Sequence, residues 1–284
     1  AQVLTHPQSG IAKRLVTAAR AREGGHTPET PNGTAVLRVE ELRCWHNLGG
    51  APWSPHWLKA VDGVSFTLQS GESLGVVGGS GCGKSTLCRA LMGLTPIRGG
   101  EVWLQTQNLL QLRGSAERQA RRTIQMVFQD PLACLNPALT VADAIADPLL
   151  IHGLASRAAA RERARELLEL VGLSPADHFQ NRLPKQLSGG QQQRVAIARA
   201  LALRPQVLIC DESVSMLDAE IQAEVLALLR RLQQDLGLAM IFVTHDLSVA
   251  SGFCHRVIVL DHGHVVEEGP GDRLLRQPQA TITR

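Results

Sequence analysis

Tyrosine is absent from this 284-residue chain, and aromatic residues make up only 3% of it. Long apolar runs are missing as well. The longest strings, such as VLIC at 207–210 and MIFV at 240–243, fall far short of the roughly 20 residues that a membrane-spanning helix requires. We therefore expect no segment that crosses a bilayer.

Cysteine pairs and a strong charge imbalance are also missing. The six cysteines form no Cys-x-x-Cys pair and have no histidines at zinc spacing, which indicates reduced thiols in a cytoplasmic protein. The net charge of +3, from 29 basic and 26 acidic residues, is too small to indicate nucleic acid as a partner. What the chain does have is 44% hydrophobic residues, enough for the core of one large or two modest domains.

Short β-rich runs recur from Ala35 onwards and predict strands at VLRVEEL, VSFTL, SLGVV, EVWL, IQMVF, VLIC, MIFVT and VIVL. Two of them, VLIC and MIFVT, are continuously apolar, which predicts central parallel strands covered on both faces. Between Leu139 and Leu173 the sequence is rich in Ala, Leu, Glu and Arg and predicts a helical insertion. Further helices are expected over 191–203 and 217–236, the second starting after Ser215 and ending before Gly237.

The run GGSGCGKST, Gly78 to Thr86, contains the pattern G-x-x-x-x-G-K-S between an apolar strand and a helix. Glycines let backbone amides wrap closely around phosphate oxygens, and the helix N-terminus adds partial positive charge. Lys84 is expected to reach the β- and γ-phosphates, and the Ser85 hydroxyl to bind Mg²⁺. The alternative is a flexible glycine-rich turn with no ligand.

Two carboxylates, Asp211 and Glu212, follow the buried run VLIC, and His245 follows MIFVT. Buried carboxylates are costly without a cation. We therefore expect Asp211 to hold Mg²⁺ and Glu212 to polarise the attacking water, the alternative being helix capping by these acids and Ser213. His245 stands at a strand end, where α/β sheets bind their ligands.

The motif LSGGQ at 187–191 completes a pattern that resembles an ATP-binding cassette (ABC) transporter ATPase subunit from about Ala35 to Gly269. The other motifs of that family follow in order, and they are the phosphate loop at 78–85, Gln129 in FQDP, Asp211–Glu212, SMLD at 215–218 and His245.

The resemblance implies an α/β fold of the P-loop NTPase type, with a RecA-like core, an antiparallel β subdomain and an inserted helical subdomain over about 132–190. Residues 1–34 would be a tail or linker, and 35–284 one ABC ATP-binding domain. It also implies ATP hydrolysis coupled to transmembrane transport, with ATP and Mg²⁺ as cofactors.

The family's site residues carry over by position. Glu212, His245 and Gln129 would be catalytic, and Ser85, Gln129 and Asp211 would hold the metal. The expected nucleotide contacts are Trp45, Gly78, Ser80, Gly81, Cys82, Gly83, Lys84, Ser85, Thr86, Ser188, Gly189, Gly190, Gln191 and Asp218. Because the chain has no tyrosine, the ring that stacks on adenine would be Trp45, which has the better ring, or, one residue on, His46, which fits the strand register better.

In the family, LSGGQ and Asp218 face the nucleotide of a second ABC module, so a head-to-tail dimer is expected. The other expected partners are transmembrane permease subunits and, indirectly, an extracytoplasmic solute-binding protein. The place would be peripheral, on the cytoplasmic face of a bacterial inner membrane.

Two segments look most like those of importers for oligopeptides, dipeptides and nickel, and they are FQDPLACLNP and KAVDGVSFTLQSGESLGVVG. Ser213 departs from the family, which commonly has Pro there, and PQATITR replaces its usual His-Pro-Tyr element. Two other functions remain open, a soluble ABC ATPase outside transport and a nucleotide-binding partner that does not hydrolyse.

The N-terminal stretch VLTHPQSGIAKR, residues 3–14, echoes LLRQPQATITR near the end, with four identities in eleven when Pro7 is aligned with Pro278. One hypothesis is that residues 3–14 are the end of an upstream ABC module, fused through a Gly/Pro-rich linker so that the dimer partner is tethered in cis. The alternative is a coincidental amphipathic helix.

Overall fold

Two β-sheets and the helices around them form the part of the chain that the computed structural model describes, residues 31, 33–51 and 54–280. The N-terminal echo lies outside these residues, so the fusion hypothesis stays a prediction. Over the same described residues, no helix has the length and apolarity to span a membrane.

The central sheet has six strands in the order β10-β9-β3-β8-β7-β6. All neighbours pair in parallel except β10, which runs antiparallel to β9. This confirms VLIC and MIFVT as central parallel strands. The strands are β3 (Ser73–Val77), β6 (Ile124–Val127), β7 (Val207–Asp211), β8 (Ala239–Thr244), β9 (Arg256–Asp261) and β10 (His264–Gly269).

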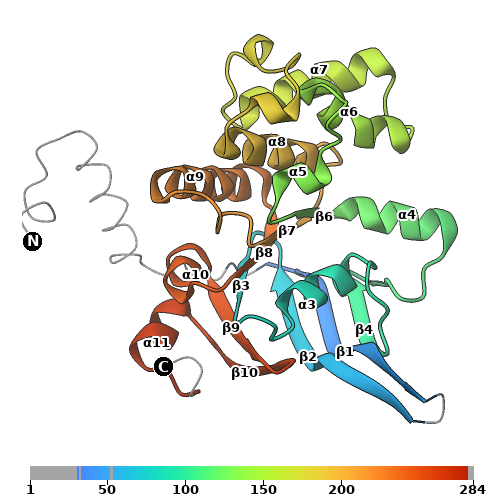
Figure 1. Ribbon diagram of the computed structural model, residues 1–284, viewed down its shortest axis with the longest axis vertical. Coiled ribbons are helices and arrows are strands. Elements are labelled where there is room, and N and C mark those ends of the chain that lie inside the picture. Colours follow the sequence, from blue (N-terminus) through green and yellow to red (C-terminus); the bar gives the residue numbers. More distant parts are fainter. Residues whose placement is uncertain (1–30, 32, 52–53, 281–284) are drawn as a thin grey trace, which may run out of the picture.

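A second, antiparallel sheet has the order β2-β1-β4-β5. Two long strands, β1 (Ala35–Ala51) and β2 (Ser54–Gln69), form a hairpin that projects beyond the rest of the sheet (Figure 1). The shorter strands β4 (Gly99–Leu104) and β5 (Gln107–Asn108) pair beside β1.

Helices gather in one block at the top of Figure 1, where α6, α7 and α8 pack together. The expected helical insertion is present as α6 (Val141–Ile151) and α7 (Arg157–Leu170). The remaining helices and turns are α3 (Lys84–Leu91), α4 (Gly114–Thr123), α5 (Pro131–Cys134), η1 (Ala176–His178), η2 (Pro184–Gln186), α8 (Gly189–Leu201), α9 (Ala219–Leu236), α10 (Leu247–Phe253) and α11 (Gly271–Arg276).

The predicted helix starts are wrong by two residues at both α8 and α9. Helix α8 begins after Ser188, whose hydroxyl accepts from the Gln191 amide, and α9 begins after Asp218, whose carboxylate accepts from Ile221. A side-chain cap fixes each start because it satisfies one of the free amides of the first turn. The predicted end of α9 is confirmed, since Gly237 closes it in the left-handed conformation.

Strand β10 has no counterpart among the expected strands. Its residues alternate between exposed and half-buried at the edge of the sheet, so HVVEEG lacks the continuous apolar signal of the central strands.

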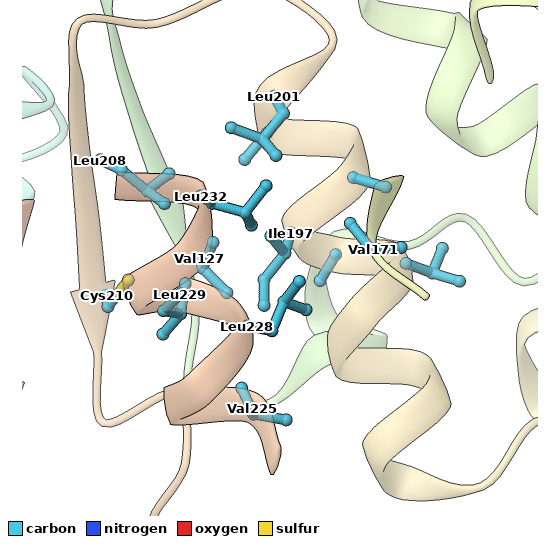
Figure 2. Close-up of a cluster of buried hydrophobic side chains, with 14 of the residues drawn as sticks. Val127, Val171, Ile197, Leu201, Leu208, Cys210, Val225, Leu228, Leu229 and Leu232 are labelled. Carbon is cyan, nitrogen blue, oxygen red and sulfur yellow. The ribbon is translucent and has the colours of Figure 1, made fainter. Parts of the chain in front are cut away.

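Two hydrophobic cores lie on opposite faces of the central sheet. Alternate residues of β7 enter each, Leu208 and Cys210 one core and Val207 and Ile209 the other. In the first core, side chains of α8 point toward those of α9 (Figure 2). The second core is shared with α3 and the antiparallel sheet. Burial on both faces is why β7 is apolar throughout.

Candidate functional site

A cavity of about 570 Å³ opens at the carboxyl ends of β3, β7 and β8. This is the edge at which ligands bind in α/β sheets. It is lined by His46, Leu58, Ala60, Ser80, Gly81, Gly83, Lys84, Ser85, Thr86, Gln129, Glu212 and His245.

The loop between β3 and α3 needs its glycines. Gly83 has a φ of 112°, and a Cβ there would lie 2.0 Å from the carbonyl oxygen of Ala60. A Cβ on Gly78, with φ 157°, would lie 2.2 Å from the carbonyl oxygen of Leu260. Glycine therefore lets the loop pack against β2 and β9 while its amides stay close to the cavity.

Lys84 stands at the start of α3 with its ammonium group folded over the loop. Nζ donates hydrogen bonds of 2.9 Å to the carbonyl oxygens of both Gly78 and Gly79. The residue is only 5% exposed, yet it lines the cavity. A cation held in this position beside a helix N-terminus suits the binding of a phosphate chain.

Asp211, the last residue of β7, is buried next to the first turn of α3. The Ser85 hydroxyl donates to its carboxylate at 3.4 Å. Burial raises the pKa of Asp211, and the Ser85 hydrogen bond partly opposes that rise. A buried carboxylate with a hydroxyl beside it favours a bound cation.

Glu212 follows with a φ of 46°, in the left-handed region that non-glycine residues rarely adopt. Backbone strain of this kind concentrates at functional sites. The Gln129 amide nitrogen lies 3.2 Å from the Glu212 carboxylate, and His245 Nδ1 lies 3.9 Å from it. These three side chains from separate segments converge on one point of the cavity. The next residue, Ser213, is buried, and Glu212 still lines the cavity.

Of the two rings considered for adenine, the structure places His46 at the cavity and Trp45 outside its lining. His46 Nε2 lies 3.4 Å from the hydroxyl of Thr86 in the phosphate loop. The Trp45 ring instead carries the ammonium group of Lys59, 4.9 Å from its centroid. Neighbouring residues of a strand point to opposite faces, so only one of the two can reach the site.

The residues of LSGGQ and Asp218 lie elsewhere. None of them lines the cavity, and they meet each other at the N-termini of α8 and α9. Ser188 and Gln191 form a reciprocal capping box, and Gly190 fits against Ile221, where a Cβ would approach to 2.5 Å. The predicted nucleotide contacts therefore fall into two groups within this chain, one at the cavity and one at these helix N-termini. Trp45, Gly78 and Cys82 line neither.

Leu58 and Ala60 line the cavity and were not predicted. Leu58 pairs with His46 across the β1–β2 register. Their apolar side chains carry no motif, and only the strand register could have indicated them.

The fit of a divalent cation can be tested on the donor set. The described residues contain no cluster of three or more His, Cys, Asp or Glu side chains at metal-binding spacing. Ser85 and Asp211 offer hard oxygen donors side by side, and Gln129 lies near Glu212. This small set of protein oxygens beside a phosphate site suits Mg²⁺, because that ion keeps several waters and also binds substrate phosphates.

A family model described as "ABC transporter" matches residues 61–215. The chain is 45% identical over 260 residues to the oligopeptide transport ATP-binding protein OppF of Escherichia coli strain K12, covering 90% of this chain and 77% of that protein. It is 48% identical over 225 residues to the glutathione import ATP-binding protein GsiA of Pectobacterium atrosepticum, covering 79% of this chain and 36% of that protein.

Solved structures agree on the fold. The ATP-binding cassette MJ0796, in a dimeric post-hydrolysis state bound to ADP and Pi, matches with a TM-score of 0.72 and 33% identity, covering 82% of this chain and 98% of that one. CbiO1 from Clostridium perfringens, part of the ABC transporter complex cbiONQ, matches with a TM-score of 0.73 and 28% identity over 86% of this chain and 91% of that one.

Proposed function

Because the chain belongs to the ABC transporter family, we propose that it is the ATPase subunit of a bacterial importer for peptides. It binds and hydrolyses ATP, and this hydrolysis powers import. Peptides are the proposed cargo because the relatives at 45–48% identity are named for oligopeptide, peptide and glutathione import. The observation that carries the proposal is the convergence of Lys84, Ser85, Gln129, Glu212 and His245 on one cavity.

The phosphate chain of ATP would lie over the loop of residues 78–86, with Lys84 beside the β- and γ-phosphates. Moving the ammonium group from the carbonyl oxygens of Gly78 and Gly79 to phosphate oxygens exchanges neutral acceptors for charged ones, which form stronger hydrogen bonds. Adenine would stack on His46, with Leu58 packing beside it.

Mg²⁺, when bound, would neutralise phosphate charge and be held by Ser85, Asp211 and Gln129. Its charge would also compensate the buried carboxylate of Asp211. Glu212 would accept a proton from the attacking water, and His245 would contact the γ-phosphate.

The second group, residues 188–191 with Asp218, would complete the site of another ABC module in a head-to-tail dimer. Within the chain these residues do not reach its own cavity. The N-terminus of α8 would bring the amide groups of Gly189 and Gly190 to the partner's γ-phosphate. The dimeric cassettes among the similar structures support this arrangement.

Permease subunits and, through them, a solute-binding protein are the remaining proposed partners. The chain would be peripheral to the membrane, on its cytoplasmic side. Residues 35–284 would act as one ATP-binding domain with its helical subdomain over about 132–190.

Mixing two inactive variants tests the composite site. Ser188→Arg should block the surface formed by the LSGGQ motif, residues 187–191. Glu212→Gln should remove the carboxylate that activates water. In a mixed dimer, the Glu212 of one chain and the intact signature motif of the other form one complete site. ATPase activity that returns on mixing, measured at concentrations where light scattering detects dimers, supports the proposal.

Activity that stays absent on mixing, with mixed dimers detected, would refute a site shared between copies of this chain. The alternative functions are tested by the same assay. If the unmutated assembled pair binds ATP without hydrolysing it, the chain is a nucleotide-binding partner that does not hydrolyse. Normal turnover that does not respond to reconstituted permease would indicate a soluble ATPase outside transport.

A further inference from the structure

A second cavity, of about 650 Å³, lies at the amino ends of the parallel strands, on the edge of the sheet opposite the ATP site. Its walls come from the start of β1, from α7, and from the connections that lead into β7 and β8. This volume is within the range of ligand pockets in proteins. None of the residues proposed for nucleotide binding lines it.

The floor of this cavity is apolar. Leu167, Leu201 and Leu238 line it and are each 3% exposed or less. All three belong to the hydrophobic core between α7, α8 and α9, and Leu201 lies at one end of that cluster in Figure 2. The cavity thus reaches core side chains and offers an apolar surface to a ligand.

Two arginines, Arg163 and Arg204, are the only charged residues among those that line it. Arg163 Nη1 donates to Glu166 at 2.6 Å, but its Nε is buried and has no hydrogen-bond partner among the described residues. The side chain as a whole is 30% exposed, so a ligand in the cavity would meet the terminal nitrogens of the guanidinium group and not the buried Nε.

Arg204 has a φ of 51° in the turn between α8 and β7. Glycine would adopt this conformation at lower cost. Within the described part of the chain, Arg204 has no ion-pair partner. Its guanidinium group is therefore available to an anion in the cavity.

The helix ends limit how much negative charge the cavity can accept. Helices α7, α8 and α9 all end here, at Leu170, Leu201 and Leu236, and a helix C-terminus carries partial negative charge. Arg163 is already paired with Glu166, so Arg204 supplies the uncompensated positive charge, which matches a single carboxylate, whereas a polyphosphate would be repelled by the three helix ends. This charge pattern is the reverse of that at the ATP site.

We propose that this cavity is a binding site for an amphipathic organic monoanion, with a carboxylate on Arg163 and Arg204 and an apolar body against the leucine floor. Such a ligand would touch α7, the α8–β7 turn and the α9–β8 turn together. The site is separate from the nucleotide pocket and does not depend on the function proposed above.

Sodium decanoate, kept below its micelle concentration, is a suitable probe of the full-length chain by isothermal titration calorimetry and thermal shift. Decanoate should bind and raise the melting temperature. Decanol and decyltrimethylammonium should each bind at least about tenfold more weakly, because they lack the carboxylate. The variant Lys84→Ala should bind decanoate as the unmutated chain does, since the ATP site takes no part.

Two variants test the arginines. Arg163→Gln and Arg204→Gly should each raise the decanoate Kd at least about tenfold, while Arg118→Gln, on the exposed face of α4, should leave it unchanged. Arg204→Gly also relieves the left-handed backbone, so it should melt at the same temperature as the parent or higher. A loss of binding in this variant therefore cannot come from unfolding.

Three results would overturn the proposal. The first is that no binding is detected when the decanoate concentration reaches 10 times the protein concentration and extends into the millimolar range. The second is an equal affinity for decanoate and decanol, which would indicate a purely apolar pocket. The third is binding that persists in both folded arginine variants.

Discussion

The two ends of the parallel strands hold their polar groups in opposite ways. At the carboxyl ends, Glu212 has a left-handed backbone, and its carboxylate lies 3.2 Å from the Gln129 amide nitrogen and 3.9 Å from His245 Nδ1. At the amino ends, Glu72 is fully buried and accepts from Arg256 at 3.0 Å.

The same contrast holds for His245, which follows β8, and His255, which precedes β9. His245 is 62% exposed in its side chain and faces the ATP site. His255 is held 2.6 Å from the Ser73 hydroxyl and 3.0 Å from the Ser73 amide, where it joins β9 to β3. The carboxyl ends thus leave Glu212 and His245 open for chemistry, whereas the polar groups that join β3 and β9 at their amino ends are paired and hold these two strands together.

The largest expected effect is at the carboxyl edge. Glu212→Gln should slow ATP hydrolysis by roughly 10²–10⁴, about 3–5 kcal/mol of barrier, because the amide cannot accept the proton of the attacking water. ATP binding and the melting temperature should hardly change. Steady-state ATPase assays of the assembled complex measure this, with Glu162→Gln, at an exposed position of α7, as a control. Near-normal turnover would remove Glu212 from the mechanism.

At the amino edge, Glu72→Gln should instead reduce stability. Removing one partner of a buried ion pair leaves Arg256 under-compensated and should cost about 3 kcal/mol. The kcat of the folded fraction should remain. Urea unfolding measures the loss, and Glu268→Gln is the matched control, because Glu268 is an exposed partner of the same arginine and should cost about 1 kcal/mol or less. Equal losses in both variants would contradict the contrast between buried and exposed partners.

A smaller effect separates the two rings at the hairpin. His46→Ala should weaken ATP binding by about three- to tenfold, as expected for the loss of one stacking contact worth about 1 kcal/mol. Trp45→Ala should leave the ATP Kd within about twofold. Titrations with ATP on the two variants compare them directly. The opposite result would return the adenine contact to Trp45.

The smallest effect concerns pH. Burial lowers the pKa of His255 below its ordinary value, although the nearby Glu72 opposes this and Arg230 adds to it. The unfolded chain therefore binds the proton more readily, so this histidine stabilises the fold above about pH 6.5 and that stability is lost as the pH falls. The slope is at most about 1.4 kcal/mol per pH unit for one proton.

Replacing His255 with Asn should flatten the fall of the melting temperature between pH 7.5 and 5. His262→Asn, an exposed histidine beyond β9, should leave the slope unchanged. A parallel pH dependence in parent and His255→Asn would show that another group controls it.

Much of the fold could be predicted because its signals are local. Continuous apolar runs mark β7 and β8, and the Ala- and Leu-rich block marks α6 and α7. The predicted starts of α8 and α9 were wrong because several polar residues before each helix could serve as the cap. The path of the preceding loop decides which of these polar residues caps the helix. Strand β10 was missed because edge strands carry only half an apolar pattern.

The sequence by itself determined the phosphate loop, the two carboxylates and the signature motif, because each needs particular backbone and side-chain chemistry within a few consecutive residues. Only the tertiary structure decided which of these meet. It joins Gln129, Glu212 and His245 at one cavity and leaves Ser188 and Asp218 on another surface. Strand register brought His46 and not Trp45 to that cavity, and the packing of three helix ends created the second cavity. Such contacts join residues far apart in the chain, so no local pattern encodes them.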